Sequence, residues 1–405
     1  MLRTVEIKNF RSCYSTKFDF GGTFCAIAGR NGVGKSNILK AIEWACESVI
    51  VTDGIRLATA GNPAEELDEL SIKFNLVLAE RAYEYQMRVP KLGRRFRVAG
   101  SPLPGLQESL HIGGGDSPQE RIFERDGEFI QVAGRAEQIR IPRFTPALAA
   151  LFSLLAVDDP SRMHVELLTS FFKGMRYYSL DDRPVARDYV TEKAFNEWKF
   201  RYQSEGELTD SVAMRLIYMW QEEAILFGEL LHILGPGGLD VIEKIDIMPM
   251  EGPIVQGESK DAAISSTKLF MPMVIPSVHM GGAGQFYPFS DLSVGTRRVV
   301  RIIASMLFDR RSMMLIEQPE DSIHSGLLRK LIDQIRTYSF ETQMLFTTHS
   351  LDVLDILRPE EILLASAPGG STTVRKLTPG EIDRAKAFLR TDGSLSDFLE
   401  PLDDL

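Results

Sequence analysis

The chain has 405 residues, 44% of them hydrophobic, which is enough to bury a large core and suggests two or three domains. A formal net charge of -10 argues against a general nucleic-acid binder, although it leaves room for a local basic groove. The sequence has no apolar run long enough to span a membrane, and its three cysteines lack metal-site spacing and are too few for a disulfide framework. We therefore expect a cytoplasmic protein.

The first fifty residues predict strands followed by a helix. Apolar side chains alternate with polar ones from Val5 to Ile7 and from Phe18 to Phe20, as in half-buried strands. The segment 24–28 is an apolar run typical of a buried strand. After a glycine-rich turn, residues 37–49 carry apolar side chains at helical spacing.

The turn between that strand and that helix matches a phosphate-binding loop completely. Its sequence is Gly29-Arg30-Asn31-Gly32-Val33-Gly34-Lys35-Ser36, the pattern G-x-x-x-x-G-K-[ST]. Glycines let the backbone N–H groups curl around phosphates, and the following helix N-terminus adds positive potential. Lys35 is placed to reach the β- and γ-phosphates, and the Ser36 hydroxyl to ligate Mg²⁺. The sequence therefore predicts ATP binding.

The middle of the chain changes from strand to helical patterns. Residues 70–78 and 83–89 alternate, and Asp126-Gly127 separates two further strand patterns, which is a hairpin signal. From about 145 to 235 the pattern is helical, with Thr209 or Asp210 as the cap of one long helix that ends at Gly235. Tyr177 and Tyr178 within this region are interpreted as packing residues.

The last third returns to alternating strands and helices, which is typical of an α/β fold. Leu292-Ser293-Val294-Gly295 opens a helix, Glu317 follows an apolar strand, and His349 follows another. Each short motif has a simpler reading when taken alone. Ser293 can be a helix cap, and His349 can be a packed or surface histidine. Their order and close spacing favour a second half of the nucleotide site.

This order of motifs resembles that of ABC-type ATPases. Ile7-Lys8-Asn9-Phe10-Arg11-Ser12 narrows the resemblance to the RecF/SMC branch, and to compact predicted AAA-type ATPases similar to the ATPase part of OLD-family nucleases. Glu317-Gln318-Pro319-Glu320, followed by Ile323-His324, is similar to the Glu-Glu-Pro-Glu and Leu-His stretch of that compact group. The resemblance covers roughly the first 50 and the last 130 residues.

The resemblance implies a role for each motif residue. The loop 29–36, with Asn37, would bind ATP, and Ser36 and Glu317 would hold Mg²⁺. Ser293 and Gly295 would reach the γ-phosphate of ATP bound to a second copy of the chain, so two chains would pack head to tail as a homodimer. His349 would be the switch histidine, and His324 would lie in a loop that crosses the dimer interface.

Gln318 departs from the family pattern. The family usually has Glu at this position, where it orients and deprotonates the attacking water. An amide can orient water but cannot accept its proton, so the sequence predicts slow turnover and a long-lived ATP-bound dimer. Glu320, two residues later, is the candidate to take over the base role. The family usually has a glutamine in a lid loop over the nucleotide. No glutamine of this chain matches it well, and Gln86 and Gln107 are weak candidates.

The densest basic cluster is the candidate for contact with DNA. It contains Lys91, Arg94, Arg95 and Arg97, and the corresponding lobe approaches DNA in RecF/SMC relatives. The simpler reading is a solvated hairpin turn. Arg297, Arg298 and Arg301 follow the signature and either bind phosphate or face solvent.

The expected fold is α/β: an ABC-ATPase head with a P-loop core, a β-rich subdomain, a helical insertion and no long coiled coil. Its expected domains are 1–60, the N-terminal P-loop lobe; 61–140, the β-rich subdomain; 141–240, the helical insertion; and 241–405, the C-terminal lobe.

Three functions compete. One is an ATP-dependent switch in a DNA-associated process, most simply antiphage defence with a partner effector, a nuclease or toxin, because the chain beyond His349 is too short for the TOPRIM nuclease domain of OLD nucleases. The second is a stand-alone RecF/SMC-like ATPase of DNA repair. The third, the ATPase subunit of a transporter, does not suit the Asn9-Phe10-Arg11 start or the long middle segment.

Overall fold

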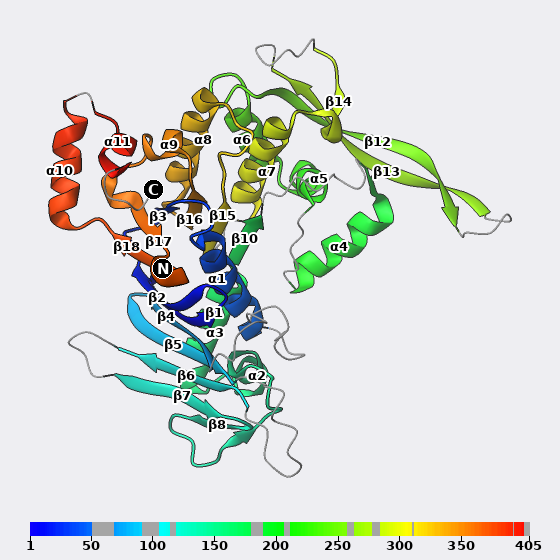
Figure 1. Cartoon of the computed structure of the whole chain (residues 1–405). Coiled ribbons are helices and arrows are strands. Elements are labelled where there is room, and N and C mark those ends of the chain that lie inside the picture. Colours follow the sequence, from blue (N-terminus) through cyan, green and yellow to red (C-terminus); the bar gives the residue numbers. More distant parts are fainter. Residues whose placement is uncertain are drawn as a thin grey trace. The chain divides into compact units, whose positions relative to one another are not determined.

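The computed structural model (Figure 1) describes residues 1–50, 69–90, 105–113, 119–179, 189–205, 211–256, 263–277, 284–309, 312–391 and 393–400. The chain divides into two compact units. Unit 1 consists of Met1–Ser179, Arg311–Gln318 and Ser339–Leu405. Unit 2 consists of Leu180–Arg310 and Pro319–Tyr338.

A six-stranded, mostly parallel sheet forms the centre of unit 1. Its strand order is β10 (Met175–Ser179), β15 (Met313–Glu317), β16 (Gln343–Thr348), β3 (Phe24–Ala28), β17 (Ile362–Ser366) and β18 (Thr373–Lys376). The first five run parallel and β18 runs antiparallel to β17. Every residue of β3 and β16 is buried, as expected for central strands covered on both faces.

Helix α1 (Lys35–Ile50) follows β3 and packs between the two sheets of unit 1. It contacts β10 and β15 of the parallel sheet and β1 of the second sheet, and α2 (Ala147–Leu154) and α3 (Pro160–Lys173) pack beside it. Ile38, Leu39 and Ile42 are fully buried, which explains the apolar helical spacing in the sequence. The predicted strand, loop and helix around the phosphate loop are confirmed.

The second sheet of unit 1 has eight antiparallel strands. They are β2 (Cys13–Asp19), β1 (Leu2–Phe10), β4 (Leu70–Leu78), β5 (Arg81–Val89), β6 (Gln107–Ile112), β7 (Glu120–Asp126), β8 (Phe129–Val132) and β9 (Ile139–Arg140), in that order across the sheet. On β5, Tyr83, Tyr85 and Met87 are buried, and this confirms the predicted alternation. The hairpin predicted around Asp126-Gly127 is the turn between β7 and β8.

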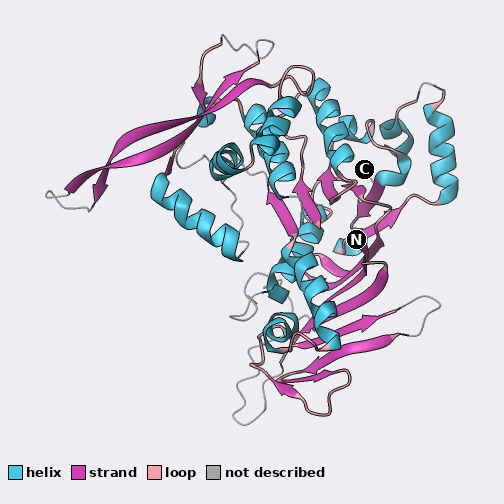
Figure 2. Ribbon diagram, turned by 180° about the vertical axis from the view of Figure 1, so that it is seen from behind, coloured by secondary structure: helices cyan, strands magenta, loops and turns pink. Residues whose placement is uncertain are grey.

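Unit 2 contains five of the described helices and a small sheet. The helices are α4 (Glu192–Glu205), α5 (Val212–Glu222), α6 (Ala224–Leu234), α7 (Val294–Asp309) and α8 (Ser325–Tyr338). The sheet has the order β11 (Val190–Thr191), β13 (Ala263–Pro276) and β12 (Ile242–Gln256), and β14 (Tyr287–Pro288) also pairs with β13. Figure 2 shows β12 and β13 side by side as one long antiparallel pair.

The long helix predicted to end at Gly235 is instead two helices. The chain breaks between α5 and α6 at Glu223, whose φ of -132° and ψ of 62° lie outside the helical region. The cap of α5 is Ser211, whose side chain accepts a hydrogen bond from the Met214 N–H. The predicted caps Thr209 and Asp210 lie outside the described residues.

Short helices complete the fold. They are α9 (Leu351–Leu354), α10 (Pro379–Leu389) and α11 (Leu395–Leu399), with 3-10 turns at Phe289–Asp291, Pro359–Glu361 and Pro368–Gly370. The longest described helices, α1 and α7, have 16 residues each, so the described part of the chain contains no long coiled coil. No described helix is long and apolar enough to cross a membrane. The described architecture is mixed α/β, as the sequence predicted.

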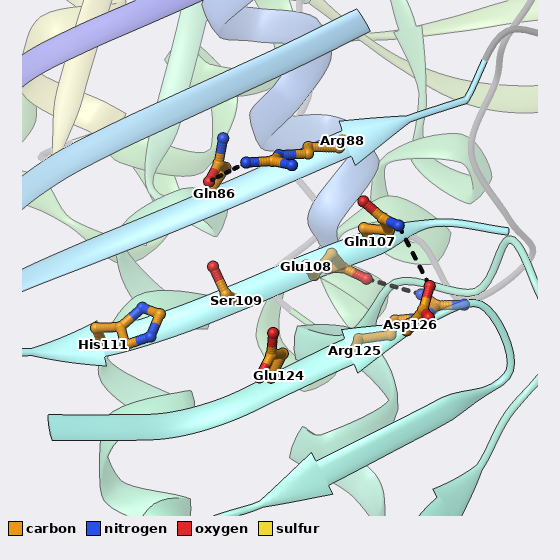
Figure 3. Close-up of a pocket in the computed structure, with 9 residues that line it drawn as sticks. All are labelled: Gln86, Arg88, Gln107, Glu108, Ser109, His111, Glu124, Arg125 and Asp126. Atoms are coloured by element: carbon orange, nitrogen blue, oxygen red, sulfur yellow. Dashed lines mark hydrogen bonds and ion pairs between the residues drawn. The ribbon is translucent and has the colours of Figure 1, made fainter. Parts of the chain in front are cut away.

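A buried ion pair joins strands β6 and β7 of the antiparallel sheet (Figure 3). The Arg125 guanidinium donates to Glu108 at 2.7 Å, and neither side chain is exposed to solvent. Glu108 also accepts from the Tyr85 hydroxyl at 2.7 Å and from the Ala147 N–H at the start of α2 at 2.8 Å. Further Arg125 N–H groups donate to the Pro142 and Arg143 carbonyls. The pair thus holds the sheet to the segment that leads into α2.

We predict that Arg125→Ala destabilises unit 1 by about 3–5 kcal/mol, because it leaves the Glu108 carboxylate buried without its cation. Hydrogen exchange of the β6 and β7 amides in urea measures this. Arg121→Ala is the control, since its pair with Glu124 is exposed and contributes about 0–1 kcal/mol. Equal protection in the two variants would contradict the prediction.

Candidate functional site

The site lies where three neighbouring parallel strands end. Strands β15, β16 and β3 are adjacent, with Glu317 paired to Thr347 and Thr348 paired to Ala28. Their carboxyl ends therefore meet at one edge of the sheet, where α/β proteins bind ligands. The phosphate loop, Gln318 and His349 each follow one of these ends.

The glycines of the loop meet specific spatial demands. Gly34 has a φ of +96°, and a Cβ there would lie 2.0 Å from the Thr372 hydroxyl and 2.5 Å from that of Ser12. A Cβ on Gly29 would lie 2.3 Å from the Ala365 carbonyl oxygen. Only glycine fits such positions, so the loop can pass this close to Ala365 of β17 and to Thr372 and Ser12.

Lys35 points back into its own loop. Its ammonium donates to the carbonyls of Gly29 at 2.5 Å and Arg30 at 2.8 Å, and the residue is 6% exposed. A cation held by two backbone carbonyls of this loop, at the N-terminus of α1, is suited to bind a phosphate chain. Ser36 follows at the first turn of α1, where its hydroxyl has the chemistry of a Mg²⁺ ligand.

Hydrogen bonds from side-chain hydroxyls hold the phosphate loop in place. The Thr372 hydroxyl donates to the Val33 carbonyl at 2.8 Å and contacts the Ser12 hydroxyl at 2.7 Å. Asn37, a predicted cofactor-binding residue, donates from its amide to Ser12 at 2.8 Å and accepts from Arg11 at 3.4 Å. The phosphate loop and the Arg11-Ser12 motif are therefore connected by one hydrogen-bond network. Nothing in the sequence indicated Thr372, which joins them from the position just before β18.

Glu317 ends β15 and has a partner that the sequence did not predict. The Tyr177 hydroxyl, on β10, donates a hydrogen bond to the Glu317 carboxylate. Burial of Tyr177, together with this negative neighbour, raises the pKa of its phenol. The interpretation of Tyr177 as a packing residue was therefore incomplete. The helical pattern assigned to residues 145–235 concealed strand β10, which places Tyr177 beside Glu317.

The structure brings two predicted catalytic residues into direct contact. The Gln318 side-chain amide donates to Nδ1 of His349 at 2.9 Å, and this geometry puts the imidazole proton on Nε2. Gln318 has a left-handed φ of 46°, and its N–H donates to the Thr347 carbonyl at 3.1 Å. A non-glycine residue in this conformation needs such support, and strained backbone of this kind gathers at functional sites.

The signature segment lies in unit 2. Ser293 caps α7, because its hydroxyl accepts from the Thr296 N–H at 3.2 Å and contacts the Thr296 hydroxyl at 2.8 Å. The interpretation of Ser293 as a helix cap is confirmed. Ser293 is also exposed, and its role in binding phosphate stays a prediction. A Cβ on Gly295 would lie 2.2 Å from the Ser322 carbonyl oxygen, which explains the glycine.

Other predicted residues of unit 2 have structural contacts. Arg297 donates to the Ser290 carbonyl at 2.5 Å, and Arg298 donates to the Asp321 carbonyl at 2.6 Å, so both hold loops beside the signature. His324 is exposed, and its Nδ1 accepts from the Gly326 N–H at 3.2 Å, near the start of α8. Glu320 is buried, with 7% of its surface exposed.

The two lid-loop guesses lie on the antiparallel sheet (Figure 3). Gln86 bonds to Ser71 and Arg88, and Gln107 to Asp126. They line a surface pocket of about 350 Å³ with polar walls, formed by β5, β6 and β7. The basic cluster of Lys91, Arg94, Arg95 and Arg97 lies outside the described residues.

The Ser36 hydroxyl and the Glu317 carboxylate have the chemistry to bind Mg²⁺ together with the phosphates of a nucleotide. Among the described residues there is no cluster of three or more His, Cys, Asp or Glu side chains able to hold a metal. Mg²⁺ in nucleotide sites is bound through phosphates and one or two side-chain oxygens, for which a hydroxyl and a carboxylate are suitable. The three cysteines are free and buried, and burial raises the pKa of each thiol.

Two family models match the chain, one on each side of its middle. Residues 4–83 match an AAA domain, and residues 244–355 match a model described as "AAA domain, putative AbiEii toxin, Type IV TA system". The first match contains the phosphate loop, and the second contains the signature, Glu317 and His349. Both models describe AAA domains, so both matches support an ATPase.

Comparison with individual proteins gives short or distant matches. The chain is 50% identical over 42 residues to the DNA double-strand break repair Rad50 ATPase of Aeropyrum pernix, a match that covers 10% of this chain and 5% of Rad50. The SMC head bound to the C-winged helix domain of ScpA is 14% identical, with a TM-score of 0.49 and coverage of 95% and 99% of the two chains. The SMC head domain of Thermotoga maritima is 13% identical, with a TM-score of 0.40 and coverage of 93% and 99%.

We predict that Thr372→Val weakens ATP binding about 3- to 10-fold, because the loop loses the hydroxyl that holds the Val33 carbonyl. Titration of a fluorescent ATP analogue measures this. Thr373→Val is the matched control, since its hydroxyl bonds to Ser366 instead. Equal affinities of the two variants would show that the Thr372 clamp does not shape the site.

Proposed function

We propose that this chain is an ATP-binding, slowly hydrolysing ABC-type ATPase that dimerises around ATP and acts as a nucleotide switch. The observation that carries the proposal is the sheet edge at which the phosphate loop, Glu317 and the Gln318–His349 pair follow adjacent strands. ATP phosphates suit the loop, and none of the other described features offers an equally complete ligand site.

In the proposed site, each residue has a separate task. Backbone N–H groups of the loop and Lys35 bind the phosphates, and Ser36 and Glu317 hold Mg²⁺, which would neutralise charge on the transferred phosphoryl group. The Gln318 amide orients the attacking water. His349, fixed through its Nδ1, presents Nε2–H as a hydrogen-bond donor. Glu320 stays a candidate proton acceptor whose burial requires it to move.

The dimer follows from the two anion sites. Ser293 and Gly295 at the N-terminus of α7 form a site that we assign to the γ-phosphate of ATP held by a second copy. Two chains related by a two-fold axis then complete both sites, and His324 lies in the loop that crosses between them. ATP would hold the dimer together, and its hydrolysis would release it.

We predict that Gln318→Glu accelerates hydrolysis about 10²- to 10⁴-fold, because a carboxylate accepts the proton of the water that an amide only orients. Phosphate release by the full chain with Mg²⁺-ATP measures this. Gln318→Ala is the second variant, and it should remove the residual turnover. Brisk wild-type turnover that Gln318→Ala leaves unchanged would refute the assigned role.

For the biological process we propose antiphage defence in the cytoplasm, with a partner effector that the nucleotide switch holds or releases. The family model over residues 244–355 is described as a putative toxin of a type IV toxin–antitoxin system, which links this segment of the chain to such two-component systems. A slow, ATP-held state suits such a scaffold, because the signal is the lifetime of the complex and not the number of ATP molecules consumed.

The alternative is a stand-alone DNA repair or recombination ATPase. The short match to a Rad50 ATPase of DNA double-strand break repair favours it. The basic cluster 91–97 then provides the DNA contact, since Lys and Arg bind phosphates by counterion release. DNA-stimulated hydrolysis distinguishes this alternative from the scaffold.

If the cluster binds DNA, reversal of Arg94 and Arg95 to Glu weakens binding to duplex DNA and flattens its dependence on salt, because each lost phosphate contact lowers the slope by about one. Fluorescence anisotropy over a range of salt concentrations measures this. Reversal of Lys386 on α10 and of Arg390, which caps that helix, controls for net charge. Affinity that ignores the reversal at Arg94 and Arg95 removes this candidate.

A further inference from the structure

Tyr177 and Glu317 face each other from neighbouring strands. Strands β10 and β15 run parallel, with Tyr177 paired to Leu315 and Ser179 paired to Glu317. The phenol of Tyr177 reaches along the strands to the end of β15 and donates to Oε2 of Glu317. Its ring packs against the core of unit 1, so the ring itself is held in place.

This contact determines where the Glu317 carboxylate can be. A glutamate side chain has several rotatable bonds, and an unrestrained one loses considerable rotamer freedom when it is fixed. Among the described residues, Tyr177 donates a hydrogen bond to Glu317, and it bonds one carboxylate oxygen. The other oxygen, Oε1, is left for a further partner.

We propose that Tyr177 is the positioning residue of the magnesium carboxylate. It fixes Oε2 of Glu317, so that Oε1 is the oxygen available to Mg²⁺ or to a water bound to it. The inference rests on the proposed function, because it takes Glu317 as a metal ligand. Partners of this kind, which orient a ligand without touching the metal, commonly change metal affinity 10- to 100-fold when removed.

The test is the dependence of nucleotide binding on magnesium in the full chain carrying Tyr177→Phe. A fluorescent ATP analogue is titrated with EDTA and then at increasing Mg²⁺ concentrations. We expect affinity in EDTA to stay within about twofold of wild type, and the Mg²⁺ concentration at half effect to rise about 10-fold. Tyr178→Phe is the matched control, because adjacent strand residues project to opposite faces, and it should behave as wild type.

Glu317→Ala and the double variant Tyr177→Phe/Glu317→Ala complete a cycle. If Tyr177 acts through Glu317, the phenylalanine adds nothing once the carboxylate is gone. An equal effect of Tyr177→Phe with and without Glu317, or none in either background, overturns the positioning role and leaves the proposed function standing. If Glu317→Ala leaves the Mg²⁺ dependence of binding unchanged, Glu317 is not a metal ligand, and the inference about Tyr177 fails as well. Weaker binding in EDTA alone would indicate a general structural defect and also contradict the inference.

Discussion

The adjacency of β15, β16 and β3 in the parallel sheet is the constraint on which the site depends. These strands come from distant parts of the chain, and their register sets Glu317 beside Thr347, and Thr348 beside Ala28. Because all three point the same way, the segments after them meet at one edge. Fully buried strands cannot slip without exposing apolar surface, so the strand ends from which these segments start are fixed in register.

Two kinds of support then act on this edge. Hydroxyl contacts from Ser12 and Thr372 hold the phosphate loop from behind, and the Tyr177 phenol holds Glu317 from the side. The support residues lie just before β18, on β10 and in the turn between β1 and β2, and none belongs to a motif that binds nucleotide. The chemistry is in the loops, and its geometry is set by the sheet.

Gln318 determines what such a site can do. Its amide donates to His349, a polarity that a carboxylate at the same position would reverse. The pair is therefore suited to hold a water and a phosphate oxygen, and it lacks a group that accepts the water's proton. In the proposed function, this favours persistence of the ATP-bound state over rapid cycling.

The sequence predicted the elements whose patterns are strong. Strand β3 and helix α1 were predicted nearly to the residue, and the strands before Glu317 and His349 and the β7–β8 hairpin were predicted in their places, because buried runs, alternation and turn glycines are local signals. Strand β10 was missed, since its five residues lie between helices and are buried only in part. Tyr177 and Thr372 were missed for a related reason: their partners are distant in sequence, and only the strand order brings them together.

The central claim is that each ATP site needs two chains, and mixing two inactive variants tests it most directly. Lys35→Ala removes the phosphate-loop cation, and Ser293→Arg blocks the signature. If the sites are shared head to tail, each variant alone is inactive, while a mixed dimer contains one site with both parts intact. Random exchange should then restore about a quarter of the wild-type sites, measured as phosphate release. A mixture no more active than either variant alone would contradict the account.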